Sequence, residues 1–377
     1  MIKSWSYKEE YKQNRKKILK TIDKTLLSGD LFFGNQLSKF ENNFKKLNKS
    51  KYGIAVGSGT DALIIALKAL GIGKSNKDEV ITVSNTAIPT ASAIKSAGAK
   101  PVFVDVGNDF LINPLKIKKA INKNTKAIIP VHLYGHPCKM DDIIKIAKKF
   151  KLKIIEDCAQ AQGAKFKNKL VGNFGDFGCF SFYPTKILGA YGDGGFITTN
   201  SIKMFRTVRR LRFYGIEQID KKNKFNGLYY SNEHGLNSRL DEIHSSILNF
   251  KIKKVKSFIL KRRQLANIYN KELKNTSLLL PKENTNCNHV YHLYTVYHPK
   301  RFKIIKELEK KKIKIGIYYP YPIHKMKGYF SKKNKNYKLN MTNKLYRGIF
   351  SLPLYPELPM KDLKKIVKSL KVILTKI

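Results

Sequence analysis

Long hydrophobic runs are missing from this chain. No stretch approaches the roughly eighteen uncharged apolar residues of a membrane-spanning helix. The first residues, MIKSWSYKEEYKQNRKK, lack the apolar region of a secretory signal peptide. These absences argue against a membrane protein and a secreted protein, and they predict a cytoplasmic protein without a membrane partner.

Cysteine is scarce, with four residues in a chain of 377 and no CxxC pair. Such a set is too sparse for a disulfide framework, so we expect reduced thiols in the core. The four are Cys138, Cys158, Cys179 and Cys287. His132 and His136 have a spacing found in metal sites, but they flank a strand end and a turn rather than one face of a helix. We therefore predict no metal, with a zinc site as the alternative.

Acidic residues are few: 27 Asp and Glu stand against 74 Lys and Arg, for a net charge of +47. Only ten of the basic residues are arginines, and the lysines are scattered from end to end beside abundant Ile and Asn. This pattern is typical of an AT-rich coding sequence, so we predict no nucleic-acid partner, although the field would steer a diphosphate-bearing substrate. One arginine cluster is compatible with a solvated helix face or with anion binding. Its members are Arg206, Arg209, Arg210 and Arg212.

The chain alternates between short apolar runs and amphipathic stretches, which predicts an α/β fold with a mostly parallel sheet covered by helices on both faces. Strands are expected at 54–56, 80–83, 101–106, 127–132, 153–157 and 177–183, with helices at 60–70, 91–96, 115–121 and 141–150. Two helices separated by a loop at 28–35 precede them. Ligands of such sheets sit at the carboxyl ends of the strands.

Helical patterns dominate after residue 200, and the length suits two domains. Helices are expected at 204–212 and 241–250 and on to about 273, then a strand at 292–297, a helix at 303–312, a strand at 313–318 and a helix from 361. We predict a large domain over 1–250 and a small C-terminal α/β domain over 251–377.

Lys186 stands between a strand-like run rich in aromatics and a glycine-rich turn, in FSFYPTKILGAYGDGG at 180–195. An apolar environment lowers the pKa of an amine, and a neutral amine attacks a carbonyl to form a Schiff base. Taken singly, the residue would be read as a surface lysine in a loop. Its neighbours in the chain decide between these readings.

Two other stretches of the sequence contain groups that could act together with such a lysine, a phosphate-binding turn and an acid. The turn GSGT at 57–60 precedes a helix, where free amide groups and the helix dipole favour a phosphate, although such residues also serve as simple caps. Glu156 and Asp157 end a strand, which is compatible with helix capping or with a functional acid. A phosphate site, an acid and a Schiff-base lysine are together what pyridoxal 5'-phosphate chemistry requires.

Several long motifs resemble those of the DegT/DnrJ/StrS family of sugar aminotransferases, in the family's order. They are SGTDALIIALKALGIG at 58–73, IIEDCAQAQGA at 154–164, GDFGCFSFYPTKILGAYGDGGFITTN at 175–200, GLNSRLDEIHSSIL at 235–248, HVYHLYTV at 289–296 and YYPYPIH at 318–324. The resemblance implies a type I aminotransferase fold and a homodimer with shared active sites. It also implies transfer of an amino group, usually from glutamate, to a ketone of a nucleotide-linked sugar, as in polysaccharide biosynthesis.

The same resemblance assigns roles by motif. Lys186 would form the aldimine with pyridoxal phosphate and shuttle the proton, and Asp157 would pair with the pyridinium nitrogen. Gln160 would lie against the ring's 3-oxygen. The cofactor phosphate would be bound by Gly59, Thr60 and Ser181, and by Asn237 of the NSRL motif reaching in from the other subunit. His324 would line the sugar or nucleotide side of the cleft.

Two positions depart from the family pattern. Ala87 stands where many members have an aromatic residue that stacks on the cofactor ring, which leaves Asn85 as a candidate. Gln162 stands where a histidine is common, and an amide cannot serve as an acid or base. Lys186 itself argues against the family's dehydratase branch, which has a histidine there.

The segments LRFYGIEQ at 211–218 and NSRLDEI at 237–243 look more like members that aminate C-3 of a 6-deoxy-keto-sugar on dTDP. We therefore expect a dTDP-3-keto-6-deoxyhexose 3-aminotransferase. Amination at C-4 of a UDP-, GDP- or dTDP-linked sugar is the alternative within the family. A non-catalytic regulatory or nucleic-acid-binding protein on the same fold is the alternative of another class, prompted by the charge.

Overall fold

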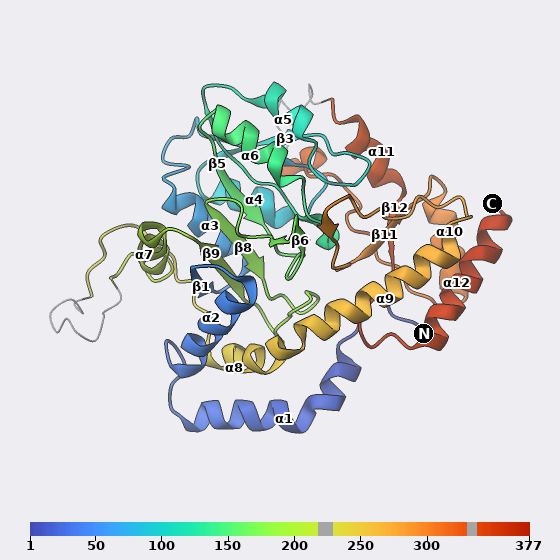
Figure 1. Cartoon of the computed structure of the whole chain (residues 1–377), viewed down its shortest axis with the longest axis horizontal. Helices are drawn as coiled ribbons and strands as arrows, with labels where there is room; N and C mark the ends of the chain where they lie inside the picture. The colour runs from blue at the N-terminus through green and yellow to red at the C-terminus, as the bar shows by residue number, and fades with distance from the viewer. Residues whose placement is uncertain (218–228, 330–337) are drawn as a thin grey trace.

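A seven-stranded sheet forms the centre of the molecule (Figure 1). The computed structural model describes residues 1–217, 229–329 and 338–377, so Gln218, the last residue of the LRFYGIEQ segment, lies outside the described residues. The strand order is β1 (Tyr52–Val56), β9 (Gly195–Thr199), β8 (Phe177–Ser181), β5 (Lys153–Asp157), β4 (Thr125–Ile128), β2 (Glu79–Val83) and β3 (Lys100–Val104). Within this sheet β9 is the one strand that runs opposite to the other six, which confirms the expected mostly parallel sheet.

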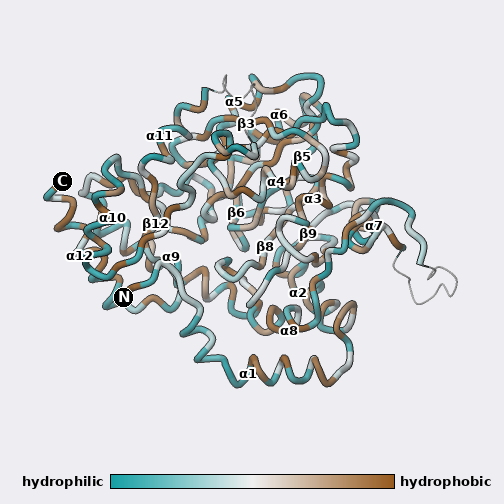
Figure 2. Tube along the Cα trace, turned by 180° about the vertical axis from the view of Figure 1, so that it is seen from behind, coloured by the Kyte–Doolittle hydropathy of each residue, from teal (hydrophilic) through white to brown (hydrophobic). Residues whose placement is uncertain are grey.

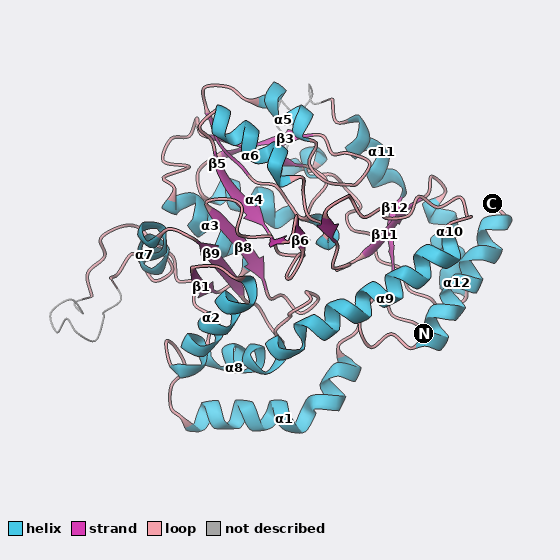
Figure 3. Ribbon diagram, in the orientation of Figure 1, coloured by secondary structure: helices cyan, strands magenta, loops and turns pink. Residues whose placement is uncertain are grey.

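Helices cover the two faces of this sheet (Figure 3). They are α3 (Gly59–Ala69), α4 (Ile88–Ser96), α5 (Pro114–Ala120), α6 (Met140–Lys149) and α7 (Ile202–Leu211). Successive residues of a strand point to opposite faces, and β2 shows the consequence. Val80 packs in a cluster with residues of α3 and α4, whereas Ile81 packs in a cluster with residues of α5 and α6.

The first two helices, α1 (Lys8–Leu27) and α2 (Asn35–Asn48), pack against α8 (Glu242–Lys251). Gly34 precedes α2 and has no side chain to cap it, so Glu242 caps the helix although it lies 208 residues from Gly34 in the sequence. Its carboxylate accepts hydrogen bonds from the N–H groups of Gly34, Gln36 and Leu37 at 2.9, 2.7 and 3.1 Å. Figure 2 shows hydrophobic and hydrophilic residues alternating along α1, and Leu26 and Leu27 near its end are exposed.

The helix α9 (Val255–Leu273) leads to the C-terminal part of the chain (Figure 1). There β11 (Tyr294–Tyr297) and β12 (Ile349–Leu352) pair antiparallel, beside α10 (Arg301–Lys310), α11 (Asn340–Gly348) and α12 (Met360–Thr375). The predicted strand at 313–318 is wrong: Ile313 and Gly316 form only isolated bridges, with Ile2 and Ser351. The division at residue 250 stays a prediction.

The cysteines are all free thiols, and three are buried while Cys287 is half-buried. Cys287 lies in the short strand β10 (Cys287–Asn288), which pairs with the hairpin of β6 (Lys165–Phe166) and β7 (Lys169–Leu170). Across 1–217, 229–329 and 338–377, no helix combines the length and the apolar composition needed to cross a bilayer.

Candidate active site

Lys186 lies in the turn that follows β8, which ends at Ser181 rather than at the predicted Tyr183. The Lys186 N–H donates to the Tyr183 carbonyl at 2.8 Å. Two of the glycines after it allow very close backbone approaches. A Cβ on Gly189 would lie 2.4 Å from the Pro184 carbonyl oxygen, and one on Gly195 would lie 2.2 Å from the Ser58 carbonyl oxygen. The glycine-rich segment therefore brings the lysine turn and the GSGT turn together.

Burial lowers the pKa of the Lys186 amine to about 8, and the nearby Asp157 carboxylate opposes part of this shift. Loss of hydration disfavours the ammonium form. At pH 8 about half of the amine is thus neutral, the form that a nucleophile requires. Lys186 is half-buried, and its lowered pKa favours a desolvated amine over an ordinary surface lysine. Its predicted role stays a prediction.

Asp157 ends β5 inside the molecule and is 6% exposed. The Thr90 hydroxyl donates to its Oδ2 at 2.8 Å, and the Ala159 N–H donates to its Oδ1 at 3.1 Å. Burial raises its pKa, while these two hydrogen bonds and the charge of Lys186 lower it. A carboxylate that is buried in this way is stabilised by a cationic partner, and a protonated pyridine nitrogen is one.

Its neighbour Glu156 caps no helix, in contrast to one of the two duties predicted for these acids. Its carboxylate caps backbone N–H groups of a loop and contacts His132 Nε2 at 3.1 Å. The loop donors are Gly172, Phe174 and Gly175. His132 Nδ1 accepts from the Cys138 N–H at 3.0 Å, so Nε2 carries the proton that Glu156 accepts.

His136 has a different partner, because its Nε2 accepts a hydrogen bond from the Asn284 N–H at 3.1 Å. These contacts give the two histidines different partners, whereas ligand atoms of His132, Glu156 and Cys158 lie within 4.8 Å of one another. The absence of a metal stays a prediction, with zinc as the alternative.

The first turn of α3 is arranged as an anion-binding site. Ser58 caps the helix by accepting from the Asp61 N–H at 3.0 Å, which leaves the N–H groups of Gly59 and Thr60 at the open end of the helix. A Cβ on Gly59 would lie 2.7 Å from the Ser181 Cβ. The structure therefore brings together the three residues of this chain predicted to bind phosphate, Gly59, Thr60 and Ser181.

Gln160 is fixed at both ends of its amide. Its Oε1 accepts from the Tyr134 N–H at 2.7 Å, and its Nε2 donates to the Tyr319 hydroxyl at 3.0 Å. Burial raises the pKa of Tyr319 above its usual value, so the phenol stays protonated. Tyr134 and Tyr319 belong to the site but were not predicted individually; Tyr319 lies in the YYPYPIH motif, which was the available signal.

His324 lies against the carboxyl end of β2. Its Nδ1 is 2.7 Å from the Ser84 hydroxyl, which also accepts from the His324 N–H at 3.0 Å. Burial lowers the pKa of His324 to about 4, so the ring is neutral at neutral pH. The structure thus joins the PIH motif to the SNTAIPT motif, which holds Asn85 and Ala87.

Several buried side-chain polar atoms have no partner among the described residues, and two of them belong to amides near the predicted cofactor residues. The Gln162 Nε2 donates to the Ser181 carbonyl at 2.6 Å, but its Oε1 has no partner, and neither has Asn85 Nδ2. Buried polar atoms without partners are rare in folded proteins and often contact a ligand. Together with the anion-binding site at α3 and the Lys186–Asp157 pair, they fit a bound cofactor that carries both a phosphate and polar ring substituents.

Asn237 is exposed and forms a β-bridge with Phe213. Its side chain makes no hydrogen bond to the described residues of its own chain, whereas the next residue, Ser238, accepts from the Gly57 N–H at 2.9 Å and donates to Asp61 at 2.8 Å. The predicted role of Asn237 in another subunit's site stays a prediction.

A family model for the DegT/DnrJ/EryC1/StrS aminotransferase family matches residues 12–371. The chain belongs to this family. It is a sugar aminotransferase of the type I fold, and its cofactor is pyridoxal 5'-phosphate. The resemblance drawn from the sequence motifs is thereby confirmed.

Three similar proteins illustrate the relationship. A dTDP-3-amino-3,4,6-trideoxy-alpha-D-glucose transaminase of Micromonospora megalomicea subsp. nigra is 39% identical, with 98% of each chain covered. A pleiotropic regulatory protein of Geobacillus stearothermophilus is 38% identical, with 96% of this chain and 95% of that protein covered. The crystal structure of S. venezuelae DesV in complex with a ketimine intermediate superposes with a TM-score of 0.91 at 33% identity, covering 98% of this chain and 97% of the other.

Proposed function

We propose that this enzyme transfers an amino group from L-glutamate to C-3 of a dTDP-linked 3-keto-6-deoxyhexose. The observation that carries the aminotransferase chemistry is that Lys186, whose pKa burial lowers to about 8, lies near enough to the buried Asp157 for the carboxylate charge to act on it. The transaminase of M. megalomicea supports the position and the nucleotide, because its name places the amino group at C-3 of a dTDP sugar. The segments around Tyr214 and Asn237 support the same choice.

Bound pyridoxal phosphate supplies an electron sink for the substrate carbon. Asp157 would hold the proton on the ring nitrogen, since its Oδ2 and Oδ1 are already oriented by Thr90 and Ala159. Lys186 would accept a proton at its Nζ from the substrate carbon and return it. Gly59, Thr60 and Ser181 would bind the phosphate, and Gln160 would donate to the ring oxygen from a side chain fixed by Tyr134 and Tyr319. His324 would line the sugar side.

The active enzyme would be a homodimer in which Asn237 completes the other subunit's phosphate site. The exposed position of Asn237 supports this assignment. Phe213, the bridge partner of Asn237, contacts the rings of Phe33 and Tyr214, and large apolar side chains are exposed there and in the 27–33 segment, which is unusual for a monomer's surface. They include Leu27, Leu31, Phe32, Phe33 and Tyr214. The compartment would be the cytoplasm, where nucleotide sugars are made.

The decisive experiment supplies the purified enzyme with pyridoxal phosphate, L-glutamate and matched dTDP-3-keto and dTDP-4-keto sugars, with mass spectrometry of the products. Amino sugar from the 3-keto substrate, abolished in Lys186→Ala and retained in the surface variant Lys203→Ala, is the expected result. Product from the 4-keto substrate alone would favour the C-4 alternative.

A regulatory role is a second candidate, favoured by one observation. A relative 38% identical over nearly the whole chain is called a pleiotropic regulatory protein. A regulator without catalysis would bind DNA with a steep dependence on salt and give no amino sugar from any donor. The complete set of predicted cofactor residues favours the aminotransferase over a non-catalytic regulator.

A further inference from the structure

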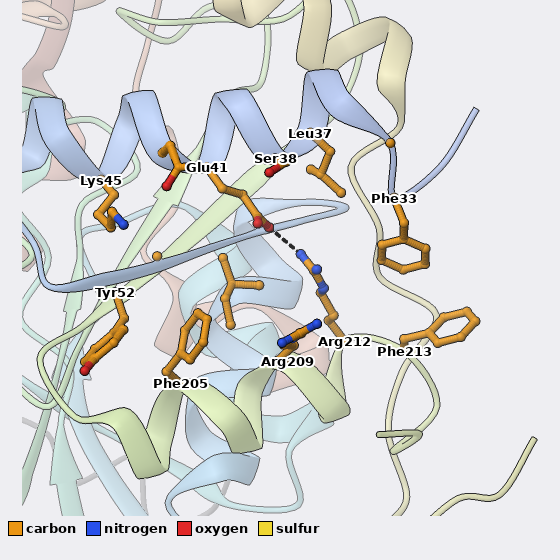
Figure 4. Close-up of a pocket in the computed structure, with 14 residues that line it drawn as sticks. Phe33, Leu37, Ser38, Glu41, Lys45, Tyr52, Phe205, Arg209, Arg212 and Phe213 are labelled. Carbon is orange, nitrogen blue, oxygen red and sulfur yellow. Dashed lines mark hydrogen bonds and ion pairs between the residues drawn. The ribbon is translucent and has the colours of Figure 1, made fainter. Parts of the chain in front are cut away.

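Lys186 lies on the wall of a small cavity of about 20 Å³, which is room for about one water molecule. A much larger groove of about 530 Å³ lies beside α2 and α7, where Glu41 and Arg212 form an ion pair (Figure 4). None of the predicted cofactor residues lines that groove. The small cavity is therefore the one that bears directly on the chemistry of the lysine.

The first residues of the chain line the same small cavity. Trp5, Ser6, Tyr7 and Glu10 contribute to its wall, and we call residues 5–10 the N-terminal segment. The other lining residues come from the turn that holds Lys186, from α8 and α9, and from the segment at 355–357. Parts of the chain that are far apart in the sequence thus meet around the lysine turn.

Both sides of the N-terminal segment are anchored. Before it, the Ile2 N–H donates to the Lys312 carbonyl at 2.8 Å, and the Ile2 carbonyl accepts from the Lys314 N–H at 2.9 Å. At its end, Lys251 Nζ of α8 donates to Glu10 Oε2 at 3.1 Å, and both of these side chains are almost fully buried. Opening this ion pair would leave a buried charge without a partner, so the contact holds the segment in place.

Aromatic rings occupy the stretch between the two anchors. Trp5 packs against the hydrophobic cluster of the C-terminal part of the chain. Its ring lies 5.6 Å from that of Tyr7, which in turn lies 5.6 Å from the ring of Tyr191, just beyond the lysine turn. Such large rings remove water from the surfaces that they cover. Tyr7 remains 43% exposed, so it separates the cavity from solvent.

The charges around the cavity balance one another. Its lining residues include two cations, Lys251 and Arg262, and two anions, Glu10 and Glu357. Among the described residues, the charge that acts on the pKa of Lys186 is that of Asp157, and it raises the pKa, whereas burial lowers it. The lowered pKa is therefore an effect of lost hydration and not of a neighbouring cation.

We propose that the N-terminal segment is a positioning element of the active site, which keeps water away from Lys186 and so holds its amine in the neutral, nucleophilic form. The segment acts through the lysine, and Trp5 and Tyr7 are the residues that exclude the water. The inference rests on the proposed role of Lys186. It gives residues 5–10 a task in the reaction that none of the sequence motifs indicates.

The test measures the pH midpoint of covalent labelling at Lys186 in the full-length, cofactor-free protein. In Trp5→Ala/Tyr7→Ala, water enters the cavity, so the midpoint should rise from near pH 8 by about one pH unit. Trp5→Phe/Tyr7→Phe keeps both rings and should retain the midpoint of wild type. The matched control is Tyr11→Ala, which removes a ring that lies 5.9 Å from that of Tyr191 but does not line the cavity. It should also leave the midpoint unchanged.

The single variant Tyr7→Ala keeps the proposal testable if the double variant does not fold. It removes a ring that is 43% exposed, so its melting temperature should stay near that of wild type while the midpoint still rises. An unchanged midpoint in a folded Ala variant would overturn the proposal. An equal rise in the Phe variant or in Tyr11→Ala would overturn it as well, because the rings at the cavity would then not be what excludes water.

Failure of this inference and failure of the proposed function are distinguishable. The labelling needs neither glutamate nor a nucleotide sugar, so it reports on the N-terminal segment alone. Absence of amino sugar from wild type would refute the proposed reaction and leave the midpoints as they are. Unchanged midpoints in an enzyme that makes amino sugar would refute only the role of the segment.

Discussion

The Thr90 hydroxyl donates a 2.8 Å hydrogen bond to Oδ2 of Asp157 and so joins the first turn of α4 to the end of β5. Thr90 is 1% exposed, and the hydrogen bond lowers the pKa of a carboxyl that burial raises. The residue that orients the predicted ring-nitrogen partner is therefore 67 residues away in sequence.

Loss of this hydroxyl should weaken cofactor retention. Thr90→Val keeps the shape but removes the donor, so the ionised form of Asp157 loses about 1.5–3 kcal/mol of stabilisation. We expect pyridoxal phosphate to dissociate from the variant about tenfold more readily, as measured by equilibrium dialysis. Thr90→Ser restores the donor and is the control. Equal retention by the Val and Ser variants would contradict the positioning role.

The reactivity of Lys186 should change with pH around its lowered pKa. The amine is neutral above its pKa, so covalent labelling of Lys186 in the cofactor-free protein should rise with a midpoint near pH 8. Mass spectrometry of the labelled peptide between pH 6 and pH 10 measures this midpoint. Because the Asp157 charge raises the pKa of Lys186, Asp157→Asn should move the midpoint to lower pH. A midpoint near that of an ordinary lysine, about pH 10, would refute the desolvated setting.

Glu242 should be a strong determinant of stability. Its carboxylate accepts three backbone N–H groups at the start of α2 and is 1% exposed, so Glu242→Ala leaves three donors without partners. We expect the free energy of unfolding in urea to fall by roughly 3 kcal/mol. The matched control is Glu307→Ala, which removes a partly exposed acid paired with Lys310. A change as small as that of the control would show that water replaces the carboxylate.

Acid should destabilise the contact between the 132–136 turn and the 283–291 segment. The rings of His136 and His289 stack at 4.9 Å, and His289 stacks on Tyr291 at 3.9 Å. Burial lowers the pKa of His136 to about 4 and that of His289 well below its usual value. Below about pH 6.5 the unfolded chain binds protons that the folded chain does not, so stability falls as the pH drops toward 4, by up to about 3 kcal/mol for His136.

The variant His289→Phe keeps an aromatic ring in this stack and removes one titrating group. Its melting temperature should depend less on pH between 6.5 and 4 than that of wild type. The exposed His234 supplies the control variant, His234→Phe, whose profile should follow wild type. An unchanged slope in His289→Phe would mean that other groups govern acid unfolding.

Much of the fold was predictable because it is encoded locally. The run that begins at Gly59 repeats apolar residues at helical spacing behind a Ser58 cap, and it forms α3. The strand and helix alternation through Asp157 predicted the mostly parallel sheet. The chain did not form a strand at 313–318, because Ile313 and Gly316 find single partners in Ile2 and Ser351 rather than a continuous neighbour.

The sequence by itself determined the family and hence the cofactor chemistry. The residue types at Lys186, Asp157, Gly59 and Thr60 indicated their predicted tasks, whereas the tasks predicted for Ser181 and Gln160 rest on the resemblance of their motifs to the family's. What only the tertiary structure decided are the contacts between distant segments: Thr90 with Asp157, Ser84 with His324, and Glu242 with the start of α2. Such pairs depend on the order of the strands and the packing of the helices, and residue spacing along the chain carries no record of them.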